Sequence, residues 1–105
     1  MSYDIDIFVG HPDGYISHFE VGNMTYNVSG MMLEACGVTF RWMHKMPAET
    51  ALPILAHAWK TMKRNPDHFR RFEVTEWGSY NDFMPFLTRF YVMARMHPTG
   101  IISVT

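Results

Sequence analysis

The chain has 105 residues, a formal net charge of −1 at neutral pH, 48% hydrophobic residues and 15% aromatic residues. This composition fits one globular domain with a substantial core and excludes an intrinsically disordered chain. The single cysteine, Cys36, excludes an internal disulfide. No run approaches the roughly 20 apolar residues of a membrane helix. The first residues lack a basic segment followed by an apolar run, so we expect no secretory signal, a cytoplasmic location and no membrane partner.

A β-hairpin is predicted at the start of the chain. Apolar residues alternate over residues 3–9, as is typical of a strand with one buried face, here made of Tyr3, Ile5, Ile7 and Val9. The sequence Gly10-His-Pro-Asp-Gly14 predicts a turn. A second strand is predicted over residues 15–21.

Helical signals follow the hairpin. A short helix is predicted over residues 30–36, with Asn27 or Ser29 as its N-cap and Gly37 as its end. Residues 38–46 form a connector in which we expect Phe40 and Trp42 to point inward.

Two longer helices are predicted in the second half of the chain. The first begins at Pro47 and ends near Arg64, where Asn65 and a proline stop it, and Pro53 must bend it or mark a late start. A short helical turn follows over residues 67–72. The last helix begins at Ser79, in a Ser-x-x-Asp capping pattern, and a strand over residues 101–104 closes the chain.

The order of these elements predicts an α+β fold in one domain, residues 1–105, with a small antiparallel sheet and the order β-β-α-α-α-β. We expect the helices to pack on one face of the sheet. The closing strand is expected beside the first, so that both ends of the chain lie in the sheet.

The segment Asn23-Met-Thr-Tyr-Asn-Val-Ser29 is the most informative stretch. It places a small hydrogen-bonding side chain at every second position, in a chain otherwise rich in Met, Phe and Leu. If the segment is extended, these side chains share one face of a strand: Asn23, Thr25, Asn27 and Ser29. Such a polar row needs partners, which are a bound ligand, the start of the next helix, or water.

A second cluster surrounds Trp77-Gly-Ser-Tyr80. Trp77 and Tyr80 offer flat faces for stacking. The helix predicted after Ser79 presents free N–H groups and the positive end of its dipole, which suit an anion. Together with the polar row, this cluster predicts a site for a nucleotide-like ligand. The alternative is a helix cap with the Trp77 indole packed in the core.

Charge is distributed unevenly along the chain. Residues 1–40 contain acids but no Lys or Arg, whereas residues 41–71 are rich in bases. Arg41 and Arg71 are therefore candidates to meet a phosphate. The alternatives are a complementary surface for a second subunit, which supports a homo-oligomer, and a helix end whose cations favour the dipole. The near-neutral net charge argues against DNA binding.

No catalytic or metal-binding motif stands out. The six His residues show no spacing typical of metal ligands, and one cysteine cannot anchor a zinc cluster. His18 with Glu20, and Asp4 with Asp6, share strand faces, but such pairs are also usual on a strand that meets water. We predict no catalytic residue, no metal and no cofactor.

Several of these motifs resemble a small family of phage and bacterial proteins. The resemblance rests on the segment 23–29, Ala51-Leu-Pro-Ile-Leu55, Asn65-Pro66, the late Trp77-Gly-Ser-Tyr80 and a closing strand after His97-Pro98. It implies the order of these motifs over nearly the whole chain, but it implies no activity. The chain departs from that pattern at Met24, where an aromatic residue is expected, and at Gly30, where proline is expected.

Three hypotheses follow. The first is a non-enzymatic, phage-type accessory protein in the host cytoplasm that sequesters a small nucleotide-like host-defence signal. Its ligand-binding residues would be Asn23, Thr25, Asn27, Ser29, Arg41, Arg71, Trp77 and Tyr80, with the site formed in part across a subunit interface. The second is an inhibitor or adaptor that binds a host protein through its Met- and aromatic-rich helices. The third is a small hydrolase that uses a histidine and a carboxylate.

Overall fold

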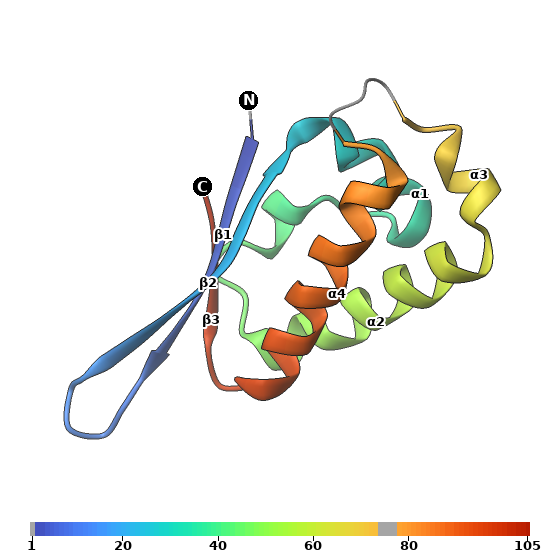
Figure 1. Cartoon of the computed structure of the whole chain (residues 1–105). Helices are drawn as coiled ribbons and strands as arrows, with labels where there is room; N and C mark the ends of the chain where they lie inside the picture. The colour runs from blue at the N-terminus through green and yellow to red at the C-terminus, as the bar shows by residue number, and fades with distance from the viewer. Residues whose placement is uncertain (1, 74–77) are drawn as a thin grey trace.

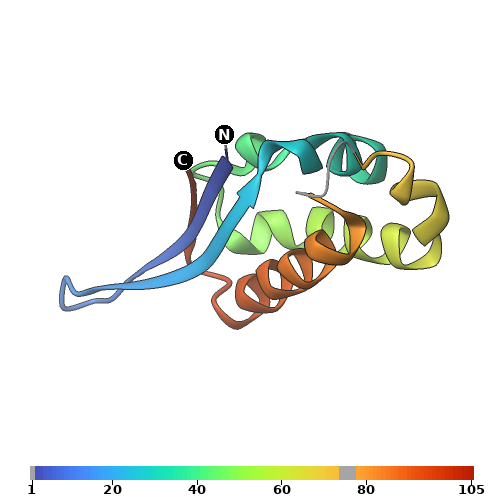
Figure 2. The same ribbon diagram turned by 45° about the horizontal axis from the view of Figure 1, so that its top comes forward.

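The computed structural model describes residues 2–73 and 78–105. It confirms the α+β class: a three-stranded antiparallel sheet lies on one side and the helices lie on the other (Figures 1 and 2). The strand order is β2-β1-β3, with strands β1 Ser2–Gly10, β2 Ile16–Thr25 and β3 Ile101–Val104. As predicted, the closing strand pairs beside the first, so both termini lie at the sheet.

The helices lie close to their predicted positions. Their bounds are α1 Ser29–Cys36, α2 Ala48–Arg64, α3 Pro66–Arg70 and α4 Tyr80–Met96, and two short 3₁₀ helices span Tyr26–Val28 (η1) and Phe40–Met43 (η2). The predicted cap of the last helix is confirmed, because the Ser79 hydroxyl accepts a hydrogen bond from the Asp82 N–H at 3.1 Å. No described helix is long and apolar enough to cross a bilayer.

The core lies between the inner face of the sheet and the helices. Tyr3, Ile5 and Ile7 of β1 are buried, as their alternation predicted. Phe40 sits at the centre of an aromatic cluster, with ring centroids 5.6 to 5.8 Å from those of Tyr3, Phe83, Phe86 and Phe90.

The expectation that Trp42 points inward is wrong, since its side chain is exposed. The connector forms a 3₁₀ helix, in which residues three apart share one side. Phe40 and Met43 are therefore both buried, and Trp42, one residue before Met43, falls on the outer side.

The turn of the hairpin follows from its sequence. The Gly14 N–H donates to the His11 carbonyl at 2.9 Å, and the His11 N–H donates to the Tyr15 carbonyl at 2.8 Å. Gly14 has a φ of +88°, a conformation that glycine adopts without strain. This arrangement is a tight turn followed by a left-handed residue, the usual form of a three-residue hairpin loop.

Beyond Phe8 the hairpin leaves the rest of the molecule. β3 pairs with β1 only between Ile5 and Phe8, so the tip of the hairpin is a two-stranded ribbon that projects from the body (Figures 1 and 2). We call residues 8–18 the arm. The arm contributes to an elongated molecule of 48 × 26 × 19 Å.

Candidate functional site

The polar segment does not stay extended. β2 ends at Thr25, Asn27 lies in η1, and Ser29 begins α1. The Thr25 hydroxyl accepts a hydrogen bond from the Asn27 N–H at 3.4 Å and so caps the 3₁₀ turn. The four polar side chains therefore do not share one strand face, because this cap turns the chain into a helix halfway along the segment.

Two of these side chains have polar partners on the first strand. The Asn23 amide donates to the Asp4 carboxylate and to the Ser2 hydroxyl, both at 2.8 Å. The Ser29 and Tyr3 hydroxyls share a hydrogen bond of 2.7 Å. Asn23 thus links two strands, and Ser29 ties the start of α1 to the sheet.

Gly78 packs directly against the polar segment. A Cβ atom at Gly78 would lie 2.9 Å from Thr25 Cγ2 and 3.1 Å from Asn27 Cβ, and its φ is +94°. The segment 23–29 therefore lies against the late glycine loop, and the predicted ligand site between them stays a prediction. At Gly78 the two parts touch with no room for an added methyl group.

Arg41 reaches the same region through a tyrosine. Its guanidinium donates to the Tyr26 hydroxyl at 2.8 Å and lies 5.8 Å from the centre of the Tyr26 ring. The Tyr26 ring in turn lies 4.4 Å from the Tyr3 ring. Tyr26 and Tyr3 therefore connect Arg41 to Ser29 through a series of internal contacts.

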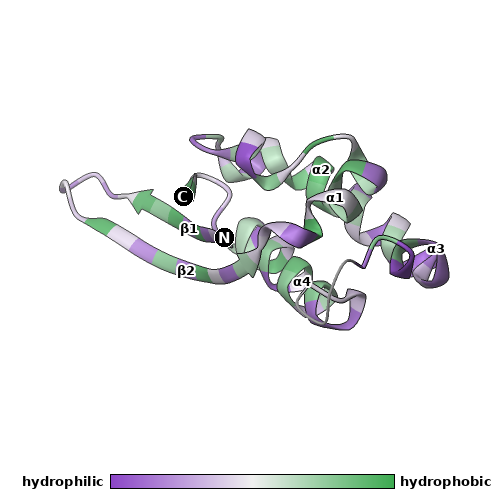
Figure 3. Ribbon diagram, turned by 90° about the horizontal axis from the view of Figure 1, so that it is seen from above, coloured by the Kyte–Doolittle hydropathy of each residue, from purple (hydrophilic) through white to green (hydrophobic). Residues whose placement is uncertain are grey.

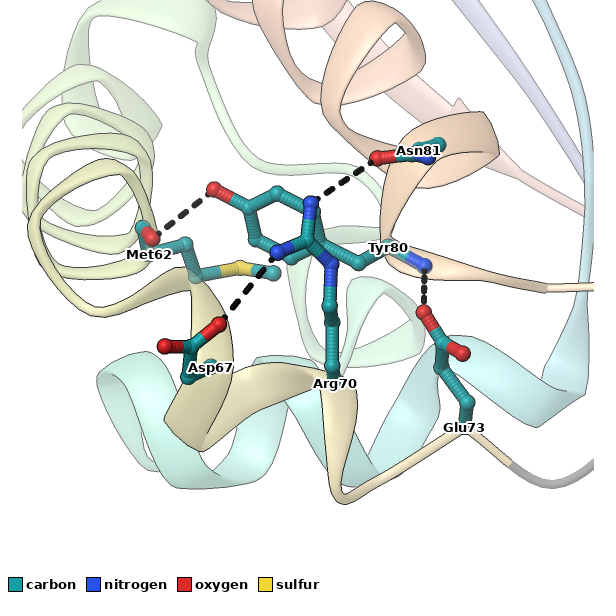
Figure 4. Close-up of polar contacts among 6 residues, drawn as sticks. All are labelled: Met62, Asp67, Arg70, Glu73, Tyr80 and Asn81. Atoms are coloured by element: carbon teal, nitrogen blue, oxygen red, sulfur yellow. Dashed lines mark hydrogen bonds and ion pairs between the residues drawn. The ribbon is translucent and has the colours of Figure 1, made fainter.

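Tyr80 is a structural residue in this arrangement (Figure 4). Its side chain is only 8% exposed, and its hydroxyl donates to the Met62 carbonyl at 3.0 Å. The Tyr80 N–H donates to the Glu73 carboxylate at 2.8 Å. Tyr80 thereby joins the start of α4 to the end of α2, and its hydroxyl is already occupied.

Arg70, which the sequence did not single out, covers the Tyr80 ring. Its guanidinium lies 4.9 Å from the ring centre and contacts Asp67 at 3.4 Å and the Asn81 side chain at 3.3 Å (Figure 4). The neighbouring Arg71 is exposed at the end of α3. Trp77, the predicted stacking residue, lies outside the described residues.

The open face of the sheet offers a different surface. The described helices lie on the inner side of the sheet and leave its outer face uncovered (Figure 1). At the base of the arm the side chains of this face are apolar: Phe8 is 38% exposed, Ile16 61% and Ile101 42%. Figure 3 shows the apolar end of β1 within the arm. Sequence reasoning missed this cluster, because the register between β1 and β3, and not the strand order alone, decides that Phe8 and Ile101 are neighbours.

The same face carries acids further along the strands. A depression of about 320 Å³ is lined by Asp4, Asp6, Glu20, Gly22 and Thr105. His18 Nε2 lies 2.6 Å from Asp6 Oδ1, and the His18 ring stacks on Phe8 with centroids 4.8 Å apart. The open face therefore combines an apolar end with an acidic end, and His18 lies between them.

Cys36 does not have the surroundings of a nucleophile. Burial raises the pKa of its thiol, and this effect outweighs the opposing influence of a hydrogen bond with the Val38 backbone. The thiol also donates to the Met32 carbonyl at 3.2 Å. Among the described residues, no three His, Cys, Asp or Glu side chains gather in a way that could hold a metal ion.

The chain was compared with protein-family models, curated proteins and solved structures. None of the three comparisons found a match. The resemblance to the phage and bacterial family therefore stays a prediction.

Proposed function

We propose that this chain is a non-enzymatic protein that binds another protein, as an inhibitor or adaptor. The docking surface is the open face of the sheet at the base of the arm, and not the Met-rich helices. The exposed apolar group formed by Phe8, Ile16 and Ile101 carries this proposal.

The position of this apolar group supports the proposal. Grouped apolar side chains on an exposed face often mark interaction surfaces, whereas scattered ones are ordinary. Phe8 and Ile101 are paired residues on adjacent strands, so their side chains lie side by side. Ile16, paired with Gly10 at the start of β2, adds a third apolar side chain to the same face.

The charges on this face define the chemistry of the partner. Asp4, Asp6 and Glu20 line the depression next to the apolar group, and residues 1–40 contain no Lys or Arg. A partner with an apolar pocket bordered by Lys or Arg side chains would be complementary in both respects.

Affinity capture with matched variants tests the proposal. The wild-type chain should retain one protein in stoichiometric amount from a lysate of the host cell, and Ile16→Lys should lose it. Leu33→Lys is the control, because Leu33 is similarly exposed, at 51%, but lies on α1. Capture that is lost equally with both variants, or with neither, would contradict a docking surface at the arm.

The nucleotide-like ligand is a second proposal, supported by the contact of Thr25 and Asn27 with Gly78 and by the position of Arg41 on the hydroxyl of Tyr26. A ligand there would compete with the contacts between Arg41 and Tyr26 and between Ser29 and Tyr3. Thermal-shift screening against cyclic nucleotides and ADP-ribose derivatives tests it. A stabilisation that Arg41→Ala abolishes and Arg95→Ala preserves would support this site, and the absence of any shift would remove it.

A further inference from the structure

The long strand β2 is an edge strand. In the order β2-β1-β3 it has a strand partner on one side only. The Tyr15 carbonyl points toward β1, since it accepts from the His11 N–H. Backbone direction alternates along a strand, so Ile16, His18 and Glu20 direct their N–H and C=O groups away from β1. Among the described residues, no strand pairs with this side of β2.

The free edge has a defined end. The Arg89 guanidinium donates to the Val21 carbonyl at 3.4 Å, and so covers the edge from the direction of α4. A bulge lies at the same point, because Ile5 pairs with Gly22 whereas Asp6 pairs with Glu20. The open part of the edge is therefore residues 16–20. An unpaired edge of this kind is a template for a further strand.

We propose that this edge pairs with the same edge of a second copy of the chain, antiparallel and around a two-fold axis at Phe19. In this register His18 of each copy lies opposite Glu20 of the other. The result is a continuous antiparallel sheet that runs β3-β1-β2 in one copy and β2-β1-β3 in the next.

Charge complementarity favours a second copy as the occupant. The order His18-Phe19-Glu20 is complementary to itself when reversed, so a two-fold axis creates the same favourable pair twice. Within its own chain His18 uses Nε2 for Asp6, and in the doubly protonated form of the ring Nδ1–H can donate to the carboxylate of the second copy. A register centred on His18 would instead place two imidazoles face to face.

Backbone geometry is consistent with this register. His18 and Glu20 are the residues whose backbone groups point outward, so each opposed pair exchanges two hydrogen bonds, about four in all. The two Phe19 residues form the central pair without hydrogen bonds, where side chains approach most closely. Each Phe19 is already stacked on His97, with centroids 3.9 Å apart, so its ring is positioned on the helix side of the joined sheet.

Sedimentation velocity over a series of concentrations tests the dimer. The wild-type chain should show a reversible monomer–dimer equilibrium. Glu20→Lys should weaken it by at least about tenfold, because two favourable pairs become unfavourable. Asp67→Lys is the matched control: it changes net charge equally, but its 97% exposed side chain lies on α3, and its effect should stay within about twofold in physiological salt.

A mixing experiment fixes the register. His18→Glu and Glu20→Lys should each fail to self-associate. Mixed in equal amounts, they should form a heterodimer in which the introduced glutamate meets the introduced lysine and the retained Glu20 meets the retained His18. This recovery would also show that both variants fold.

Two outcomes would overturn the proposal. One is a wild-type chain that stays monomeric up to its solubility limit, and the other is a mixture of the two variants that stays monomeric. Purified protein suffices for both experiments, so failure here is separate from failure of the partner proposal.

Discussion

The helical body and the arm use their side chains in opposite ways. In the body, a core of apolar side chains is enclosed, although Leu33, Trp42 and Met96 are exposed on its surface, and no described buried side-chain polar atom lacks a hydrogen-bond partner. In the arm, Ile16 and Tyr15 are largely exposed and the outer edge of β2 is open. The side chains of the body thus mainly stabilise the fold, whereas the arm exposes apolar side chains and an unpaired strand edge. Substitutions should therefore cost stability in the body and association at the arm.

The largest contrast is expected between two phenylalanines. Phe40→Ala should lower the free energy of unfolding by about 3–5 kcal/mol, because it removes a fully buried ring at the centre of the aromatic cluster. Phe8→Ala should cost no more than about 1 kcal/mol, since that ring is partly exposed. Urea denaturation of both variants measures the difference. Similar losses at the two sites would mean that the arm belongs to the same cooperative core.

Two glycines sharpen the comparison. Gly78 and Gly14 both have positive φ, at +94° and +88°, so an alanine is strained at either site. A Cβ at Gly78 also meets Thr25, whereas a Cβ at Gly14 meets nothing within 4 Å. Gly78→Ala should therefore destabilise by about 1–3 kcal/mol more than Gly14→Ala, as thermal unfolding of the two variants would measure.

A double variant identifies the cause of that difference. Thr25→Ser removes the methyl group that the new Cβ would meet. It should therefore return part of the stability lost in Gly78→Ala. Equal melting temperatures for Gly78→Ala with and without Thr25→Ser would show that the contact with Thr25 is not responsible.

Two serines give a smaller effect. Ser29→Ala removes the part-buried hydrogen bond to the Tyr3 hydroxyl and should cost about 1 kcal/mol. Ser17→Ala removes an exposed hydrogen bond to the His11 ring on the arm and should cost roughly half of that or less. Thermal unfolding compares them. A larger loss for Ser17→Ala would contradict the structural role given to the polar segment.

The smallest effect concerns Cys36. Because burial raises the pKa of its thiol, less thiolate is present at about pH 8 than in the unfolded chain, and alkylation by iodoacetamide should be slower when the chain is folded. The folded chain also holds this proton more tightly. Stability should therefore fall as pH rises above the ordinary thiol pKa, where the unfolded thiol ionises first. Equal alkylation rates in buffer and in urea would contradict this protection.

Elements with local signals could be predicted directly from the sequence. The strand β1 and the cap at Ser79 follow from spacing along the chain, since a strand repeats every two residues and a capping residue lies three positions before the acid that follows it. The order of the strands also followed, because a closing strand most readily pairs beside the first.

The roles of the polar side chains, by contrast, depend on contacts that form only in the folded chain. The partners of Asn23 and Ser29 lie on β1, and Gly78 meets Thr25 from far along the chain. A hydrogen bond to a residue far along the chain produces no periodic pattern in the sequence. The sequence therefore could not distinguish polar side chains that bond within the protein from polar side chains that bind a ligand. The same holds for the open face of the sheet, because the register between β1 and β3 in the folded chain determines that Phe8 and Ile101 lie side by side.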